Sequence, residues 1–80
     1  MQISGVDPST VVMGIGAEVK RRRQLLKLSQ VKLAKKAGVH PNVVGRLERG
    51  AYNPTVMVLH GIAAALNASL ADLTRRRRSR

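Results

Sequence analysis

The sequence contains no cysteine, tryptophan or phenylalanine, and Tyr52 is its one aromatic residue. The absence of cysteine excludes a disulfide framework and thiolate metal sites. With a single aromatic ring, a hydrophobic core must be built from Leu, Val, Ile, Ala and Met. The 80 residues suffice for one small domain at most, because a chain of this length buries only about 60–65% of its unfolded surface.

Acidic residues are also scarce, with four Asp and Glu against fifteen Lys and Arg and a formal net charge of +11. An excess of this size indicates a polyanionic partner.

Long apolar runs are missing too. Val11–Ala17 is too short for a membrane span, and its basic run follows it instead of preceding it as in a secretory signal. We therefore expect a cytoplasmic, nucleoid-associated protein without a membrane partner.

Apolar residues recur at helical spacing, and no alternating run favours a strand. Ile15, Val19 and Leu26 share one stripe of a first helix. Gly14 and Gly16 argue against a firm helix before that stripe, so residues 1–12 are predicted to form a flexible leader in which Asp7 could cap a short turn. The folded domain is predicted to span residues 13–74. The arginine-rich residues 75–80 are predicted to form a basic, disordered tail.

Capping residues divide the remaining chain into short helices. Ser29 precedes a second helix, Gln30–Ala37, which Gly38 ends. Pro41 opens a third helix, Pro41–Arg49, which Gly50 ends. A fourth helix is capped by Asn53 or Thr55 and ends at Asn67, and its apolar positions are Val56, Leu59, Ile62, Ala63 and Leu66. Ser69 and Asp72 resemble a capping box at the start of a short fifth helix, which carries Leu70 and Leu73.

The spacing of small and apolar residues across the second and third helices predicts a helix-turn-helix. Counted from Gln30, the fifth residue is the small Ala34 and the ninth is Gly38, where the turn needs a positive φ. The fifteenth and eighteenth residues are Val44 and Leu47, which pack the second helix of the motif onto the first.

Three segments resemble the phage Cro and repressor type of DNA-binding domain, also called the XRE type. Residues 28–39 (LSQVKLAKKAGV) are similar to the first half of its helix-turn-helix. Residues 46–55 (RLERGAYNPT) are similar to the end of its recognition helix, and residues 62–73 (IAAALNASLADL) to its last two helices. The resemblance implies an all-α, compact five-helix, lambda-repressor-like domain that binds operator DNA, commonly as a homodimer.

The recognition helix Pro41–Arg49 carries the candidates for base readout. Asn42 can pair with adenine and Arg46 with guanine, while Val43 can touch a thymine methyl or join the core. His40 and Pro41 stand where family members usually have Ser or Thr followed by a polar residue. His40 can contact a phosphate or replace the cap. Arg49 is a further DNA-binding candidate, and Gly45 removes a side chain on or near the groove side.

Other positions suit the phosphate backbone. Gln30 lies in the first turn of its helix, where free N–H groups favour a phosphate, although it is also read as a neutral surface residue. Lys32 and Lys36 belong to a block of basic residues that points to phosphate contact. By the resemblance, Arg23 and Glu48 form a structural ion pair between the first and recognition helices.

The leading interpretation is a sequence-specific DNA-binding transcription regulator that acts by operator occupancy. An antitoxin with a toxin partner, and a non-specific basic nucleic-acid binder, stay open as alternatives. We expect no enzyme, because no nucleophile–base arrangement is recognisable. We also expect no metal or cofactor, since His40 and His60 lack a third ligand.

Overall fold

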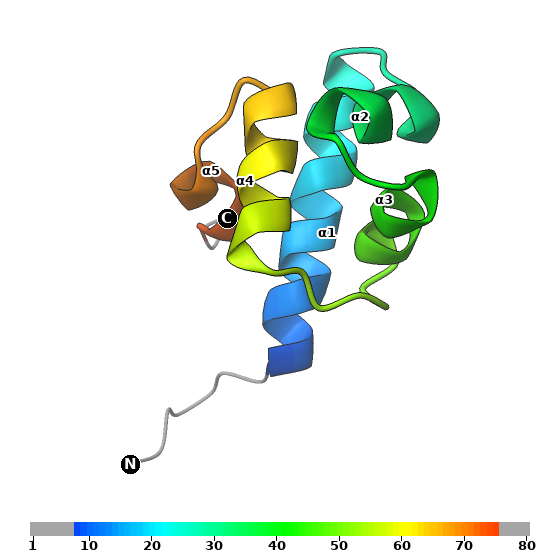
Figure 1. Cartoon of the computed structure of the whole chain (residues 1–80). Helices are drawn as coiled ribbons and strands as arrows, with labels where there is room; N and C mark the ends of the chain where they lie inside the picture. Colours follow the sequence, from blue (N-terminus) through cyan, green and yellow to red (C-terminus); the bar gives the residue numbers. More distant parts are fainter. Residues whose placement is uncertain (1–7, 76–80) are drawn as a thin grey trace.

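A computed structural model of the chain describes residues 8–75, with side chains from Thr10 onward. Its helices are α1 (Pro8–Leu25), α2 (Gln30–Ala37), α3 (Pro41–Glu48), α4 (Val56–Ala65) and α5 (Leu70–Thr74). No strand occurs between residues 8 and 75, so the predicted all-α, five-helix fold is confirmed. In Figure 1, α1 runs through the middle of the molecule, with α2 and α3 on one side of it and α5 on the other. α4 packs against both α2 and α5.

The first helix begins earlier than predicted. The assignment of residues 1–12 to a flexible leader is wrong for residues 8–12, which form the first turns of α1. Gly14 has open space around it, whereas Gly16 lies against the backbone of Leu47 and Glu48. Gly16 therefore serves the close crossing of α1 and α3 and does not break the helix. Asp7 and the rest of the predicted leader lie outside the described residues.

The four long helices end in the same way. A residue with positive φ follows each helix, and its own N–H group and that of the next residue donate to carbonyls of the helix's last turn, which is the Schellman motif. Gly38 and Gly50, both at φ 74°, were predicted for this role. Lys27 takes it after α1, with φ 58°. This turn carries Leu28 against the core, whereas the predicted core residue Leu26 is 45% exposed.

Helix starts follow the predicted capping chemistry. The hydroxyls of Ser29 and Thr55 accept hydrogen bonds from backbone N–H groups of α2 and α4, so Thr55 and not Asn53 is the cap. Ser69 and Asp72 form the predicted capping box of α5. Arg75 was predicted to belong to the disordered tail, but its N–H donates to the Ala71 carbonyl and its side chain donates to Asp72. Residues 76–80 lie outside the described part.

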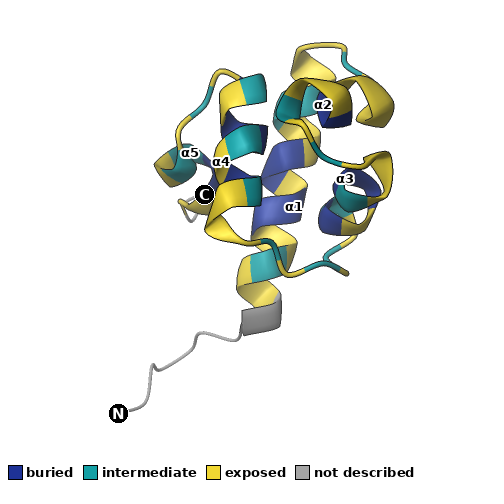
Figure 2. Cartoon of the chain, in the orientation of Figure 1, coloured by how far each residue is buried: buried dark blue, intermediate teal, exposed yellow. Residues whose placement is uncertain are grey.

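The buried core residues are all aliphatic, as the scarcity of aromatic residues leads us to expect, and Figure 2 shows them where α1 meets the other helices. Its members are Ile15, Val19, Leu33, Ala34, Val44, Leu47, Leu59, Ile62, Ala63, Leu66 and Leu73. Val56, predicted to share the buried stripe of α4, is 68% exposed. Gly61 gives α4 its close approach to α2, since a Cβ there would lie 2.9 Å from the carbonyl oxygen of Ala37.

Candidate nucleic-acid interface

α2 and α3 form the predicted helix-turn-helix. Leu33 and Ala34 of α2 are fully buried together with Val44 and Leu47 of α3. Gly38 turns the chain with φ 74°. α3 spans Pro41–Glu48, one residue shorter than the predicted recognition helix. The motif therefore fixes α3 through one apolar face and leaves its opposite face open to solvent.

His40 is the cap of the recognition helix. Its Nδ1 accepts a hydrogen bond from the backbone N–H of Asn42 at 3.0 Å, and Pro41 occupies the first turn, where a missing N–H costs nothing. An imidazole that accepts at Nδ1 carries its proton on Nε2. Because His40 is exposed, this Nε2–H group is available as a donor beside the start of α3.

The open face of α3 presents polar and charged side chains. Pro41, Asn42 and Arg46 are exposed, as is Arg49 directly after the helix, whereas Val43 is half-buried. Asn42 and Arg46 are four residues apart and so share one helical face, one turn apart. The face therefore displays an amide and a guanidinium side by side.

Arg46 is exposed yet held at the surface by the segment that follows α3. Its Cζ lies 5.7 Å from the centre of the Tyr52 ring. Its Nη2 donates to the carbonyl oxygen of Ala51 at 3.4 Å. Sequence reasoning missed Tyr52. A single aromatic residue near the end of a basic recognition helix was the only signal that could have identified it.

Glu48 carries the predicted ion pair. Arg23 donates through Nε to Glu48 Oε2 at 2.7 Å and through Nη2 to Oε1 at 3.0 Å. The two side chains are 11% and 3% exposed, and the hydrogen bond to Glu48 raises the pKa of Arg23. Arg23 also donates to the Leu28 carbonyl at 2.8 Å. The pair therefore joins α1 and α3 and neutralises an acid on the basic side of the molecule.

Gln30 joins the same network. Its Nε2 donates to Glu48 Oε1 at 3.0 Å, so the amide that was predicted to meet a phosphate is engaged with the carboxylate in the free protein. Its Oε1 would lie 3.5 Å from a Cβ placed on Gly45. Gly45 is buried and was expected near the open groove side. The side chains of Gln30 and Arg49 lie across it instead.

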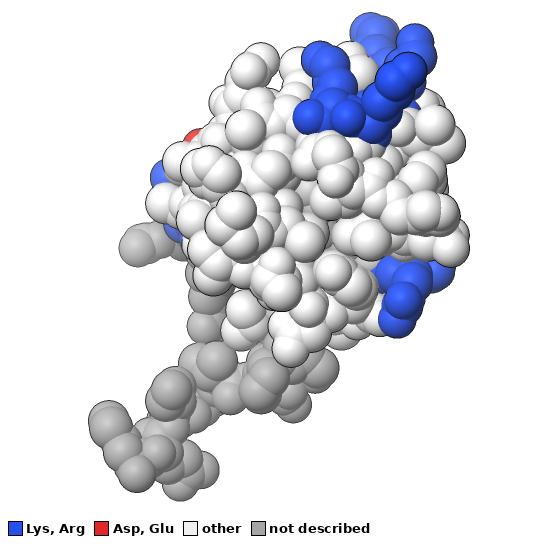
Figure 3. All heavy atoms as spheres, in the orientation of Figure 1, with Lys and Arg blue, Asp and Glu red and all other residues white. Residues whose placement is uncertain are grey.

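Exposed lysines lie on α2, the helix that packs against α3. Lys32, Lys35 and Lys36 are exposed on α2. In Figure 3, Lys and Arg atoms gather at two places on the α2–α3 side, while the surface over α4 and its preceding turn is without charge in this view. The sequence explains this area, because Gly50–Ala71 contains no Lys, Arg, Asp or Glu.

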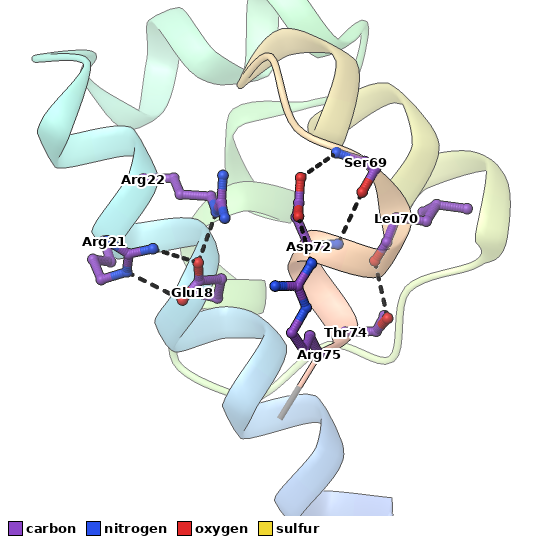
Figure 4. Close-up of polar contacts among 8 residues, drawn as sticks. All are labelled: Glu18, Arg21, Arg22, Ser69, Leu70, Asp72, Thr74 and Arg75. Atoms are coloured by element: carbon purple, nitrogen blue, oxygen red, sulfur yellow. Dashed lines mark hydrogen bonds and ion pairs between the residues drawn. The ribbon is translucent and has the colours of Figure 1, made fainter. Parts of the chain in front are cut away.

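A second charged cluster, drawn in Figure 4, lies between α1 and α5. Glu18, only 6% exposed, accepts from Arg21 Nη2 at 2.6 Å and from Arg22 Nε at 2.7 Å. The hydrogen bond from Arg21 is the main reason why the pKa of Glu18 falls to about 2. Asp72 and Arg75 line the same shallow pocket. Sequence reasoning missed this cluster, although Glu18 stands three and four residues before Arg21 and Arg22.

Within the described residues, no three His, Cys, Asp or Glu side chains gather as a metal site would require. No helix in residues 8–75 has the length and apolar character that crossing a bilayer requires.

Comparisons with known proteins agree on the family. The helix-turn-helix family profile matches residues 19–73. The chain is 36% identical over 61 residues to the immunity repressor protein of Bacillus phage phi105, covering 76% of this chain and 42% of that repressor. It therefore spans less than half of the phage protein. It is 34% identical over 55 residues to an uncharacterized HTH-type transcriptional regulator of Archaeoglobus fulgidus, covering 69% and 78% of the two chains.

A solved structure has the same architecture. The N-terminal DNA binding domain of SinR from Bacillus subtilis superposes with a TM-score of 0.76 at 30% identity, over 81% of this chain and 96% of that one. Profile, sequence relatives and fold thus point to the same group. The chain belongs to the XRE-type helix-turn-helix family of DNA-binding transcriptional regulators.

Proposed function

We propose that the chain binds one specific double-stranded DNA sequence and regulates transcription by occupying it, with α3 in the major groove. One observation carries this proposal. Asn42 and Arg46 are exposed on one face of α3 while Val44 and Leu47 fix the opposite face in the core. An amide and a guanidinium are the groups that pair with the major-groove edges of adenine and guanine.

The residues around this face would hold the phosphates. The Nε2–H group of His40 and the ammonium groups of Lys32 and Lys36 are exposed donors, as is the guanidinium of Arg49. Gln30 can reach the backbone through its main-chain N–H at the start of α2. Pro41 and Val43 would contribute apolar contacts, Val43 toward a thymine methyl.

We further propose that two copies bind together as a homodimer. A single domain reads few base pairs, and two copies on one DNA face would place half-sites about one helical turn apart. Two chains of +11 charge repel each other, so the uncharged surface from residues 50–71 is the favourable place for contact. Met57, 78% exposed, suits this surface.

The other residues considered for self-association do not all fit. Leu73 is 1% exposed and belongs to the core. Val58 and Leu70 are partly buried against the core. The contact surface would therefore centre on the start of α4, at Val56 and Met57.

Binding-site selection from random duplexes tests the function. For the cytoplasmic regulator proposed here, we expect the selected duplexes to share one palindromic sequence. Equal binding of selected and random duplexes would instead favour the non-specific nucleic-acid binder. Co-purification of an equimolar protein that loses its toxicity in the complex would favour the antitoxin.

A further inference from the structure

Tyr52 lies outside the recognition helix but touches its guanidinium. The Arg46 Cζ sits 5.7 Å from the ring centre, within the range of a cation–π contact. The ring is half-buried and packs against the core. A ring anchored in this way is a fixed platform, so the exposed Arg46 side chain has fewer orientations open to it than a free surface arginine.

The backbone after α3 fixes the distance between the two residues. The N–H of Gly50 bonds the Leu47 carbonyl at 3.0 Å, and the N–H of Ala51 bonds the Arg46 carbonyl at 2.8 Å. The Ala51 carbonyl in turn accepts from Arg46 Nη2 at 3.4 Å. The main chain and the side chain of Arg46 are therefore both tied to the segment that carries Tyr52.

The ring contact is made at the Cζ atom of Arg46, 5.7 Å from the ring centre. A guanidinium that stacks on an aromatic face keeps along its edge the N–H groups that fork onto guanine O6 and N7. The remaining bond to the Ala51 carbonyl is long and easily exchanged for a base contact.

We propose that Tyr52 is a positioning residue for base readout: it holds Arg46 in the orientation that reads one base, without itself touching that base. This proposal rests on the proposed function. The proposal predicts in which direction removal of the ring changes DNA binding. If the ring holds Arg46 in its reading orientation, removing the ring weakens discrimination between bases, because the Arg46 side chain must then be ordered on binding. If Arg46 must instead leave the ring in order to bind DNA, removing the ring tightens binding.

The test uses the full chain and the duplex obtained by binding-site selection. Affinity is measured for all four bases at each half-site position in the wild type, Tyr52→Phe, Tyr52→Leu, Arg46→Ala and the Arg46→Ala/Tyr52→Leu pair. We expect Tyr52→Leu to lower discrimination about 2- to 5-fold at the single position that Arg46→Ala affects. Tyr52→Phe, which keeps the ring, should match the wild type. Tyr52→Leu should add nothing in the Arg46→Ala background.

Each outcome separates the two proposals. If Arg46→Ala abolishes discrimination at one position but Tyr52→Leu leaves base preference unchanged or tightens binding, the role of Tyr52 is overturned. If Arg46→Ala changes discrimination at no position, both the readout by Arg46 and the role of Tyr52 are overturned, while the selected sequence still supports specific binding. Failure to select any sequence overturns the proposed function.

If Tyr52→Leu does not fold, NMR spectra of the wild type and of Tyr52→Phe, which keeps the ring, test the proposal instead. The Arg46 Nε–H resonance of the free wild-type protein should be ordered and displaced by the ring current of Tyr52, and Tyr52→Phe should preserve this displacement. A mobile Nε–H group at the random-coil shift would overturn the proposal.

Discussion

Gly16 of α1 lies directly against the carbonyl oxygen of Leu47 in α3, and a methyl group at position 16 would overlap that oxygen. The same methyl would come within 3.1 Å of the Glu48 Cα. Both obstacles are helix backbone, which cannot move aside as a flexible side chain would. The crossing therefore sets how deeply the recognition helix is seated on α1.

Replacing Gly16 by alanine should destabilise the fold strongly. We expect Gly16→Ala to lower the free energy of unfolding by about 3 kcal/mol or more, the upper end for overpacking, because backbone must shift. Gly14→Ala is the matched control, since nothing lies within 4 Å of its Cβ position. It should raise stability by about 0.5–1 kcal/mol through helix propensity. Urea unfolding of the two variants decides, and equal stabilities would contradict the close crossing.

The Arg23–Glu48 pair should contribute to stability as a coupled unit. Glu48→Ala leaves a nearly buried guanidinium without its carboxylate and should cost about 1–3 kcal/mol. Thermal melting of both single variants and the double variant measures the coupling. The exposed Arg75–Asp72 pair is the control, and Arg75→Ala should change stability much less. Additive single effects would show that Arg23 and Glu48 do not act together.

Features that depend on neighbouring residues were predictable from the sequence. The caps Ser29, Thr55 and Ser69, and the glycine turns at Gly38 and Gly50, use chemistry within a few residues of the helix end. The spacing of small and apolar residues likewise located the helix-turn-helix. Local hydrogen bonding and helical periodicity are sufficient to define such elements.

Features that depend on distant partners were not predictable from residue spacing, and the Arg23–Glu48 pair was expected only through the family resemblance. Gly16 looked like a helix breaker because its partner, Leu47, lies in another helix far along the sequence. Lys27 adopts positive φ without being glycine, so the end of α1 carried no signal and Leu26 was mistaken for Leu28 as the core residue. In the candidate interface, the Gln30 side chain over Gly45 comes from α2, and the Tyr52 ring beneath Arg46 comes from the turn after α3.

Gly45 in the recognition helix should accept a methyl group. An added Cβ would meet Arg49 Nη1 at 3.4 Å and Gln30 Oε1 at 3.5 Å, both ends of flexible side chains. We therefore expect Gly45→Ala to stabilise the domain by about 0.5–1 kcal/mol, the helix propensity difference. Chemical denaturation measures this change. A loss of stability would mean that Gln30 and Arg49 are held rigidly across α3.

Glu18 should make stability depend on pH at acidic values. Its pKa in the folded chain is about 2 against an ordinary value of 4.5, so the carboxylate stabilises the fold above about pH 4.5. That contribution is lost as pH falls from 4.5 toward 2.

Glu18→Gln isolates this contribution from that of Asp72, whose pKa is also lowered, chiefly by the backbone hydrogen bond from Ser69. At pH 7 the variant should be less stable than the wild type by about 1–3 kcal/mol, and the two stabilities should converge near pH 2. Thermal melts across this range provide the measurement. A stability difference that stays constant with pH would argue against an ionised Glu18 in the fold.

Arg46 should read a base, whereas the lysines of α2 should hold phosphates. Arg46→Lys keeps the charge but loses the planar fork that matches guanine O6 and N7. We expect it to cost about 1–3 kcal/mol for the preferred base at one position of each half-site, while non-specific affinity is retained.

Lys36→Ala is the matched control for this prediction. Lys36 is an exposed point charge on α2, so its loss should weaken binding to all sequences alike and reduce the slope of log affinity against log salt by about one unit. Titrations with the four bases at each position, repeated at several salt concentrations, compare the two variants. If Arg46→Lys weakens all four bases equally, Arg46 contacts a phosphate, and base readout by α3 must then depend on Asn42.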